Sequence, residues 1–102
     1  MAMFRQGDIL LVEVQSLPKT TLQEEEGCIL AYGEATGHTH EVKKHGKIWV
    51  DVNDTGRRYL EVMRTTALIH QEHGKILLKG PAVFEIVRQR EYSPQEIRHV
   101  QD

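Results

Sequence analysis

Short apolar runs separated by turn residues fill most of the chain, and they predict strands rather than helices. Sixteen Val and Ile residues against five Ala favour a pleated, β-branched core. The turns recur about every 8 to 12 residues, as in sandwiches and barrels. The sequence therefore predicts an all-β fold, a small antiparallel β-barrel or sandwich, as one domain spanning 1–102. The expected strands cover residues 9–14, 27–32, 38–42, 47–52, 59–63, 66–70, 75–79 and 82–89.

Two local patterns predict a hairpin and a loop. Gly46 can supply the positive φ of a tight turn, which predicts a hairpin between residues 38–42 and 47–52. Residues 19–26 have no second periodic apolar position, so they predict a solvated acidic loop.

The end of the chain is the one part with a helical signal. Ser93 is a good N-cap, Pro94 suits the first helical position, and Glu96 completes a capping box. These residues predict a short C-terminal helix that reaches His99.

Charge and cysteine content indicate the cellular compartment and the classes of partner. Thirteen Lys and Arg against fifteen Asp and Glu leave a formal charge of −2, so no basic field favours a nucleic acid. The N-terminus lacks a secretory signal, no apolar stretch is long enough to span a membrane, and the single Cys28 cannot form an intramolecular disulfide. We expect a cytoplasmic protein without a membrane or nucleic-acid partner.

Histidine is the compositional anomaly, with six residues in 102. His38 and His40 are two positions apart, so in a strand both rings project from the same face and can bind one ion. Two ligands do not fill a coordination shell, and His70, at the end of an apolar run, is the best third candidate. His73 or Glu72 is the candidate fourth ligand, and Glu34 is a more distant candidate for the same role.

Three imidazole ligands with an open position would favour a divalent transition metal, namely Zn, Ni, Fe or Mn. A small substrate could then be hydrolysed, with Glu72 and His73 as the candidate catalytic residues that relay protons. The alternative is a non-enzymatic binding or assembly module, such as a homo-oligomer paired through strand edges, in which the histidines are incidental.

The segment Gly33-Glu34-Ala35-Thr36-Gly37-His38-Thr39-His40, followed by a later His and another strand, loosely resembles the cupin arrangement. That resemblance implies a small metal-binding β-barrel with a His-x-His pair and a His on a later strand. Two features depart from the cupin pattern: Glu41 directly follows the pair, and the Gly-Pro-Gly signature is absent. The same segment and Val87-Arg88-Gln89-Arg90-Glu91-Tyr92 also resemble a group of short uncharacterised bacterial and phage proteins, which implies a complete protein of 102 residues but no activity.

Overall fold

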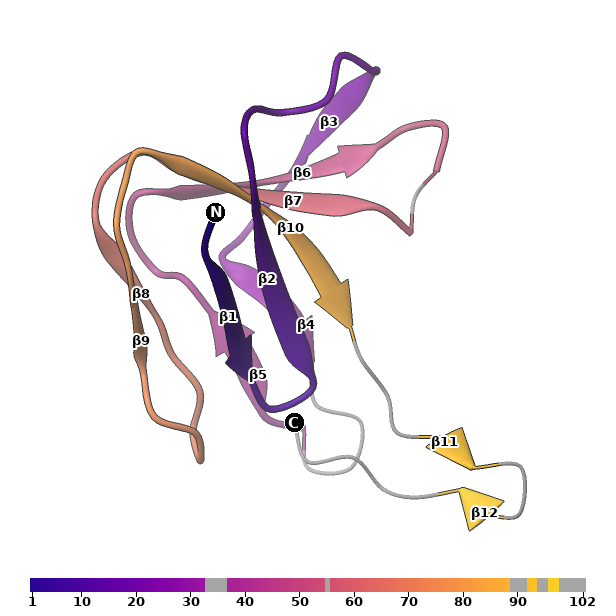
Figure 1. Cartoon of the computed structure of the whole chain (residues 1–102), viewed down its shortest axis with the longest axis vertical. Helices are drawn as coiled ribbons and strands as arrows, with labels where there is room; N and C mark the ends of the chain where they lie inside the picture. The colour runs from indigo at the N-terminus through magenta and orange to yellow at the C-terminus, as the bar shows by residue number, and fades with distance from the viewer. Residues whose placement is uncertain (33–36, 55, 89–91, 94–95, 98–102) are drawn as a thin grey trace.

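The computed structural model describes residues 1–32, 37–54, 56–88, 92–93 and 96–97, and every regular element in these ranges is a β-strand (Figure 1). The strands are β1 (Met3–Gln6), β2 (Ile9–Val14), β3 (Leu22–Glu25), β4 (Ile29–Tyr32), β5 (Thr39–Glu41), β6 (Gly46–Asp51), β7 (Arg58–Val62), β8 (Thr66–Leu68), β9 (Ile76–Leu78), β10 (Ala82–Arg88), β11 (Tyr92–Ser93) and β12 (Glu96–Ile97). The all-β prediction is confirmed. No helix in the described residues is long and apolar enough to cross a membrane.

Six strands form one antiparallel sheet in the order β1-β2-β10-β7-β6-β3. Within the described residues β1 pairs only with β2, and β3 pairs only with β6, so the sheet has two edges. Of the two predicted architectures, barrel or sandwich, a closed barrel is therefore wrong for the described residues. Closure needs the first and last strands to pair, and here the edge strands are four residues each.

One face of this sheet forms the core. Across neighbouring strands Phe84 lies opposite Leu60, and Leu60 lies opposite Ile48, so the three side chains share a face. All three are at most 2% exposed. Each burial of this size is favourable by about 1.5 to 3 kcal/mol, which explains why these β-branched and aromatic runs form the central strands.

A second layer of short strands covers that face (Figure 1). β4 pairs with β5, and β8 pairs with β9. A bridge between Glu41 and Ile69 joins the two pairs through reciprocal backbone hydrogen bonds of 3.0 and 2.8 Å. Leu30 from β4 and Leu78 from β9 are both fully buried in the common core.

The predicted hairpin between residues 38–42 and 47–52 is wrong. β5 pairs with β4, whereas β6 already has β3 on one side and β7 on the other. A strand with both edges occupied has no backbone groups left for a third partner. The positive φ of 62° falls on His45, not on Gly46.

Two further predictions need correction. Part of the expected loop at 19–26 is the edge strand β3, which needs only one partner strand and so shows little apolar periodicity. In the tail, β11 and β12 pair with each other where a helix was expected. Ser followed by Pro suits a turn as well as a helix N-terminus, so that signal did not distinguish the two; the remaining tail positions, including Pro94 and His99, lie outside the described residues.

Gly80 follows β9 and packs closely against the backbone of Arg64, which precedes β8. A Cβ at this position would lie 2.7 to 2.9 Å from the backbone of Arg64, so Gly80→Ala is expected to lower the free energy of unfolding by about 1 to 3 kcal/mol. Gly74→Ala is the matched control, because a Cβ there meets no heavy atom within 4 Å. Urea denaturation of both variants measures the difference, and equal midpoints would contradict the predicted clash.

Candidate functional site

Four imidazole rings lie together at one end of the second layer. The ring centre of His70 is 5.4 Å from that of His38, 4.4 Å from that of His40 and 4.7 Å from that of His73. The rings of His40 and His73 are 6.5 Å apart and nearly parallel. The spacing of the sequence predicted that His38 and His40 would meet His70, and the structure brings these rings together.

Two chain segments about thirty residues apart supply the rings. His40 lies on β5, and His70 follows β8; the bridge from Glu41 to Ile69 places these neighbours side by side. Thr39 and Glu41 point to the other face, where their side chains share a 2.6 Å hydrogen bond. The alternation expected for an extended strand is therefore present.

The turn after β8 fixes the ring of His70. Its Nδ1 accepts hydrogen bonds from the backbone N–H groups of Glu72 (3.0 Å) and His73 (3.2 Å). A neutral imidazole that accepts at Nδ1 carries its proton on Nε2. His70 must give up these two bonds, or turn its ring, before its lone pair can reach an ion.

His40 is fully buried, and both of its ring nitrogens face oxygen atoms. Nδ1 lies 2.9 Å from Oε1 of Gln6, and Nε2 lies 3.2 Å from Oδ1 of Asp8. The amide of Gln6 cannot be reversed, because its NH₂ donates to the carbonyl oxygens of Leu68 (3.1 Å) and Gly74 (3.0 Å). Oε1 is thus an acceptor, and Nδ1 of His40 must donate to it.

Asp8 is also buried and has a second partner. Its Oδ2 accepts a 2.9 Å hydrogen bond from Nε of Arg88, so the carboxylate links a guanidinium to an imidazole. The turn that places Asp8 here has Gly7 at φ 59°, a conformation that glycine adopts readily. Gln6 and Asp8 therefore flank the tip of the β1–β2 hairpin and point into the core.

Burial lowers the pKa of His40 from 6.5 to about 4, and the neighbouring His70 adds to this effect. Asp8 acts in the opposite direction, but burial prevails. At neutral pH the imidazole is consequently uncharged, with its proton held on Nδ1 by Gln6. Its Nε2 lone pair then faces an oxygen of Asp8 at 3.2 Å, so two electron-rich atoms oppose each other in the core.

This opposition disappears when a cation lies between the two atoms. A proton is disfavoured there by burial, whereas a transition metal bonds to a neutral imidazole and to a carboxylate. Metal-bound histidines usually donate their other N–H to a fixed acceptor, which is the part that Gln6 plays for His40. Ligands of a tetrahedral zinc ion place their ring centres about 5 Å apart, close to the separations around His70.

The present arrangement is not a finished metal centre. In the part of the chain that the structure describes, no three His, Cys, Asp or Glu side chains are positioned to hold an ion. His40 and His73 are wider apart than two tetrahedral ligands, and His70 is engaged at Nδ1. Side-chain movement around the turn that follows β8 would be required to assemble one.

The other predicted site residues lie at the border of the cluster. Glu72 is half exposed, with Oε1 3.7 Å from Nδ1 of His38. His73 has a buried Nε2 for which the described residues provide no hydrogen-bond partner. Glu34 lies outside the described residues, and His45 is in the turn before β6.

Sequence reasoning missed Gln6 and Asp8. Their signal was present, because both are polar residues beside the first apolar run, around a glycine that suits a two-residue turn. Their burial, at 2% exposure each, depends on β5 lying against this turn, and no local pattern encodes that contact.

The fold and this cluster define a small β-protein with an open antiparallel sheet and one fully buried histidine beside three partly buried ones. Residues 5–89 match the family described as Domain of unknown function (DUF8820), and the chain belongs to that family. No curated protein and no solved structure matches it.

Proposed function

We propose that this protein binds a divalent transition metal, Zn, Ni, Fe or Mn, among the clustered imidazoles. The observation that supports this proposal is the buried Nε2 of His40 opposite Oδ1 of Asp8, beside three further imidazole rings. The ligands are His38, His40 and His70, as the spacing of the sequence suggests, with Asp8 added by its contact and His73 as an alternative donor.

Catalysis is the second part of the proposal. An ion that keeps a coordination position open beyond these four ligands, or that binds only three of them, would supply Lewis acidity for hydrolysis of a small substrate. Glu72 is the proton carrier in this scheme, since its carboxylate is half exposed and lies beside His38. His73 is a second proton carrier in this scheme, because its ring centre is 4.7 Å from that of His70.

Metal titration is the direct test. Calorimetry with Zn²⁺ on tag-free protein is expected to give one tight site per chain, weakened by about 10- to 100-fold or more in His70→Ala. His45→Asn is the matched control, because it removes an imidazole outside the cluster and Asn tolerates the positive φ of 62° there. Equal affinities for His70→Ala and His45→Asn would contradict the assignment.

The same titration followed by NMR tests the movement that the site requires. Since Nδ1 of His70 accepts from the amides of Glu72 and His73, these two amides are expected to shift most when zinc binds. Unchanged amides alongside tight binding would place the ion elsewhere.

The non-enzymatic alternative rests on a different observation. β1 and β3 are unpaired on their outer edges within the described residues, and Met3 on β1 is 63% exposed. An exposed edge of this kind can pair with a second copy or with a partner strand. A dimer seen by light scattering, in protein without bound metal, would favour this assembly function.

A further inference from the structure

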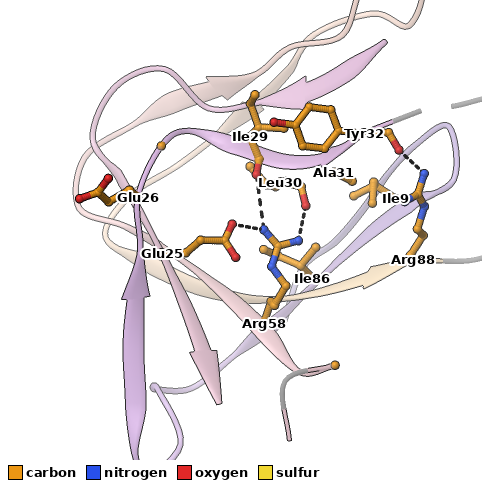
Figure 2. A pocket seen from close by; sticks show the side chains of 12 residues that line it. Ile9, Glu25, Glu26, Ile29, Leu30, Ala31, Tyr32, Arg58, Ile86 and Arg88 are labelled. Atoms are coloured by element: carbon orange, nitrogen blue, oxygen red, sulfur yellow. Dashed lines mark hydrogen bonds and ion pairs between the residues drawn. The ribbon is translucent and has the colours of Figure 1, made fainter. Parts of the chain in front are cut away.

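A cavity separate from the imidazole cluster lies between β4 and the inner face of the main sheet (Figure 2). Its volume is about 570 Å³, within the range of about 300 to 1,000 Å³ that is typical of small-molecule sites. The charged side chains of its wall are Glu25, Glu26, Arg58 and Arg88. The other lining residues are Ile9, Gly27, Ile29, Leu30, Ala31, Tyr32, Gly56 and Ile86.

The floor of the cavity is aliphatic and fixed. Ile9 from the sheet is 1% exposed, and Leu30 and Ala31 from β4 are 0% and 9% exposed. These side chains belong to the common core and cannot move aside easily. The floor therefore suits the apolar body of a ligand.

Two arginines tie β4 to the main sheet, because both project from the inner face of the sheet. Arg58 lies opposite Ile86 in the β7–β10 pair, and its guanidinium donates to the carbonyl oxygens of Ile29 and Leu30. Arg88 donates to the carbonyl oxygen of Tyr32 (Figure 2). The cavity is thus closed on two sides by cations that are fixed in place.

Arg58 retains a donor that nothing in the described residues uses. Its Nε is buried and has no hydrogen-bond partner there, although its terminal nitrogens are engaged. A buried N–H group of this kind normally donates to a hydrogen-bond acceptor. Glu25 already pairs with a terminal nitrogen of the same guanidinium at 2.6 Å, so a ligand acceptor has to approach from the Nε side.

We propose that this cavity binds a small monocarboxylate with an aliphatic or aromatic body. The carboxylate accepts from Nε of Arg58, and the body rests on Ile29 and Ala31. An amine is disfavoured at this position, because Glu25 is already paired with Arg58 and Glu26 is at the end of the cavity away from Arg88 (Figure 2). The proposal is independent of metal binding, since no ring of the cluster lines the cavity.

The test compares three probes of one shape: hexanoate, hexanamide and hexylamine, titrated into the full chain and followed by amide NMR. Hexanoate is expected to shift the amides of residues 29–32 and to bind about tenfold more tightly than hexanamide, with no such shift from hexylamine. If hexanoate leaves these amides unchanged, or if hexylamine binds as tightly, the proposal is overturned.

Two variants and a control complete the experiment. Arg58→Lys keeps the charge but removes the fork of donors, and is expected to weaken hexanoate binding about tenfold. Ile29→Phe fills the half-buried wall and is expected to block binding without altering charge, which keeps the test decisive if Arg58→Lys fails to fold. Glu24→Gln changes an exposed carboxylate that does not line the cavity, and it serves as the unchanged control; hexanoate binding to Ile29→Phe at the wild-type affinity would place the ligand elsewhere.

Discussion

Asp8→Asn is expected to lower the free energy of unfolding by about 3 kcal/mol. The carboxylate is 3% exposed and lies between Nε of Arg88 at 2.9 Å and Nε2 of His40 at 3.2 Å. The amide keeps the shape of the side chain but leaves the guanidinium without its counter-charge. Breaking a buried pair from one side costs about 3 to 5 kcal/mol, and the partial exposure of Arg88 puts the expected loss at the lower end.

Urea denaturation at pH 7 measures this loss. Asp54→Asn is the matched control, because Asp54 is exposed and its change is expected to stay within about 0.5 kcal/mol. A loss below about 1 kcal/mol for Asp8→Asn would mean that the buried ion pair of Asp8 with Arg88 does not stabilise the fold.

The second large effect is a loss of stability in mild acid. Burial lowers the pKa of His40 from 6.5 to about 4, so between these values the unfolded chain binds a proton that the folded chain does not. Stability is therefore fully present above pH 6.5 and decreases as the pH falls towards 4. A shift of this size corresponds to about 3 kcal/mol.

A His40→Gln variant isolates this contribution, since other groups titrate in the same range. Chemical denaturation between pH 4 and 7.5, with chelator present, is expected to show a steeper fall for the wild-type chain than for the variant. Parallel curves would contradict a buried, neutral His40.

The central strands could be predicted from local pattern because alternate residues of their apolar runs are buried, namely Ile9 and Leu11 in β2 and Phe84 and Ile86 in β10. β2 and β10 carry dense β-branched runs, and both lie inside the sheet. The edge strands β1 and β3 escaped prediction, since an edge needs only backbone pairing on one side. The strand order was also beyond local pattern: β10 lies between β2 and β7, a contact between distant parts of the sequence.

Two of the four clustered rings, His38 and His40, could be predicted to lie on one face from their spacing alone. Alternation predicted that His38 and His40 would share a face, and the apolar run before His70 predicted its place at the end of a strand. The position of His73 depended on a turn, which the hydrogen bond from its amide to His70 now defines. Gln6, which fixes the tautomer of His40, and Asp8, which faces its other ring nitrogen, could not be predicted because they meet His40 only through the tertiary fold.

The β-rich fold agrees with the prediction from the sequence, but the resemblance to cupins is not shown, and in the described residues the sheet remains open between β1 and β3. Ligation by the clustered histidines is still a prediction. It depends on whether an ion, rather than a proton, occupies the space between His40 and Asp8.

Native metal content is the measurement that tests this most directly. Tag-free protein, purified without added metal or chelator, would be analysed by elemental mass spectrometry beside a His38→Ala/His70→Ala variant and the His45→Asn control. We expect close to one divalent transition-metal ion per chain in the wild type and the control, with most of it lost in the double variant. A trace content that is the same in all three proteins would contradict it.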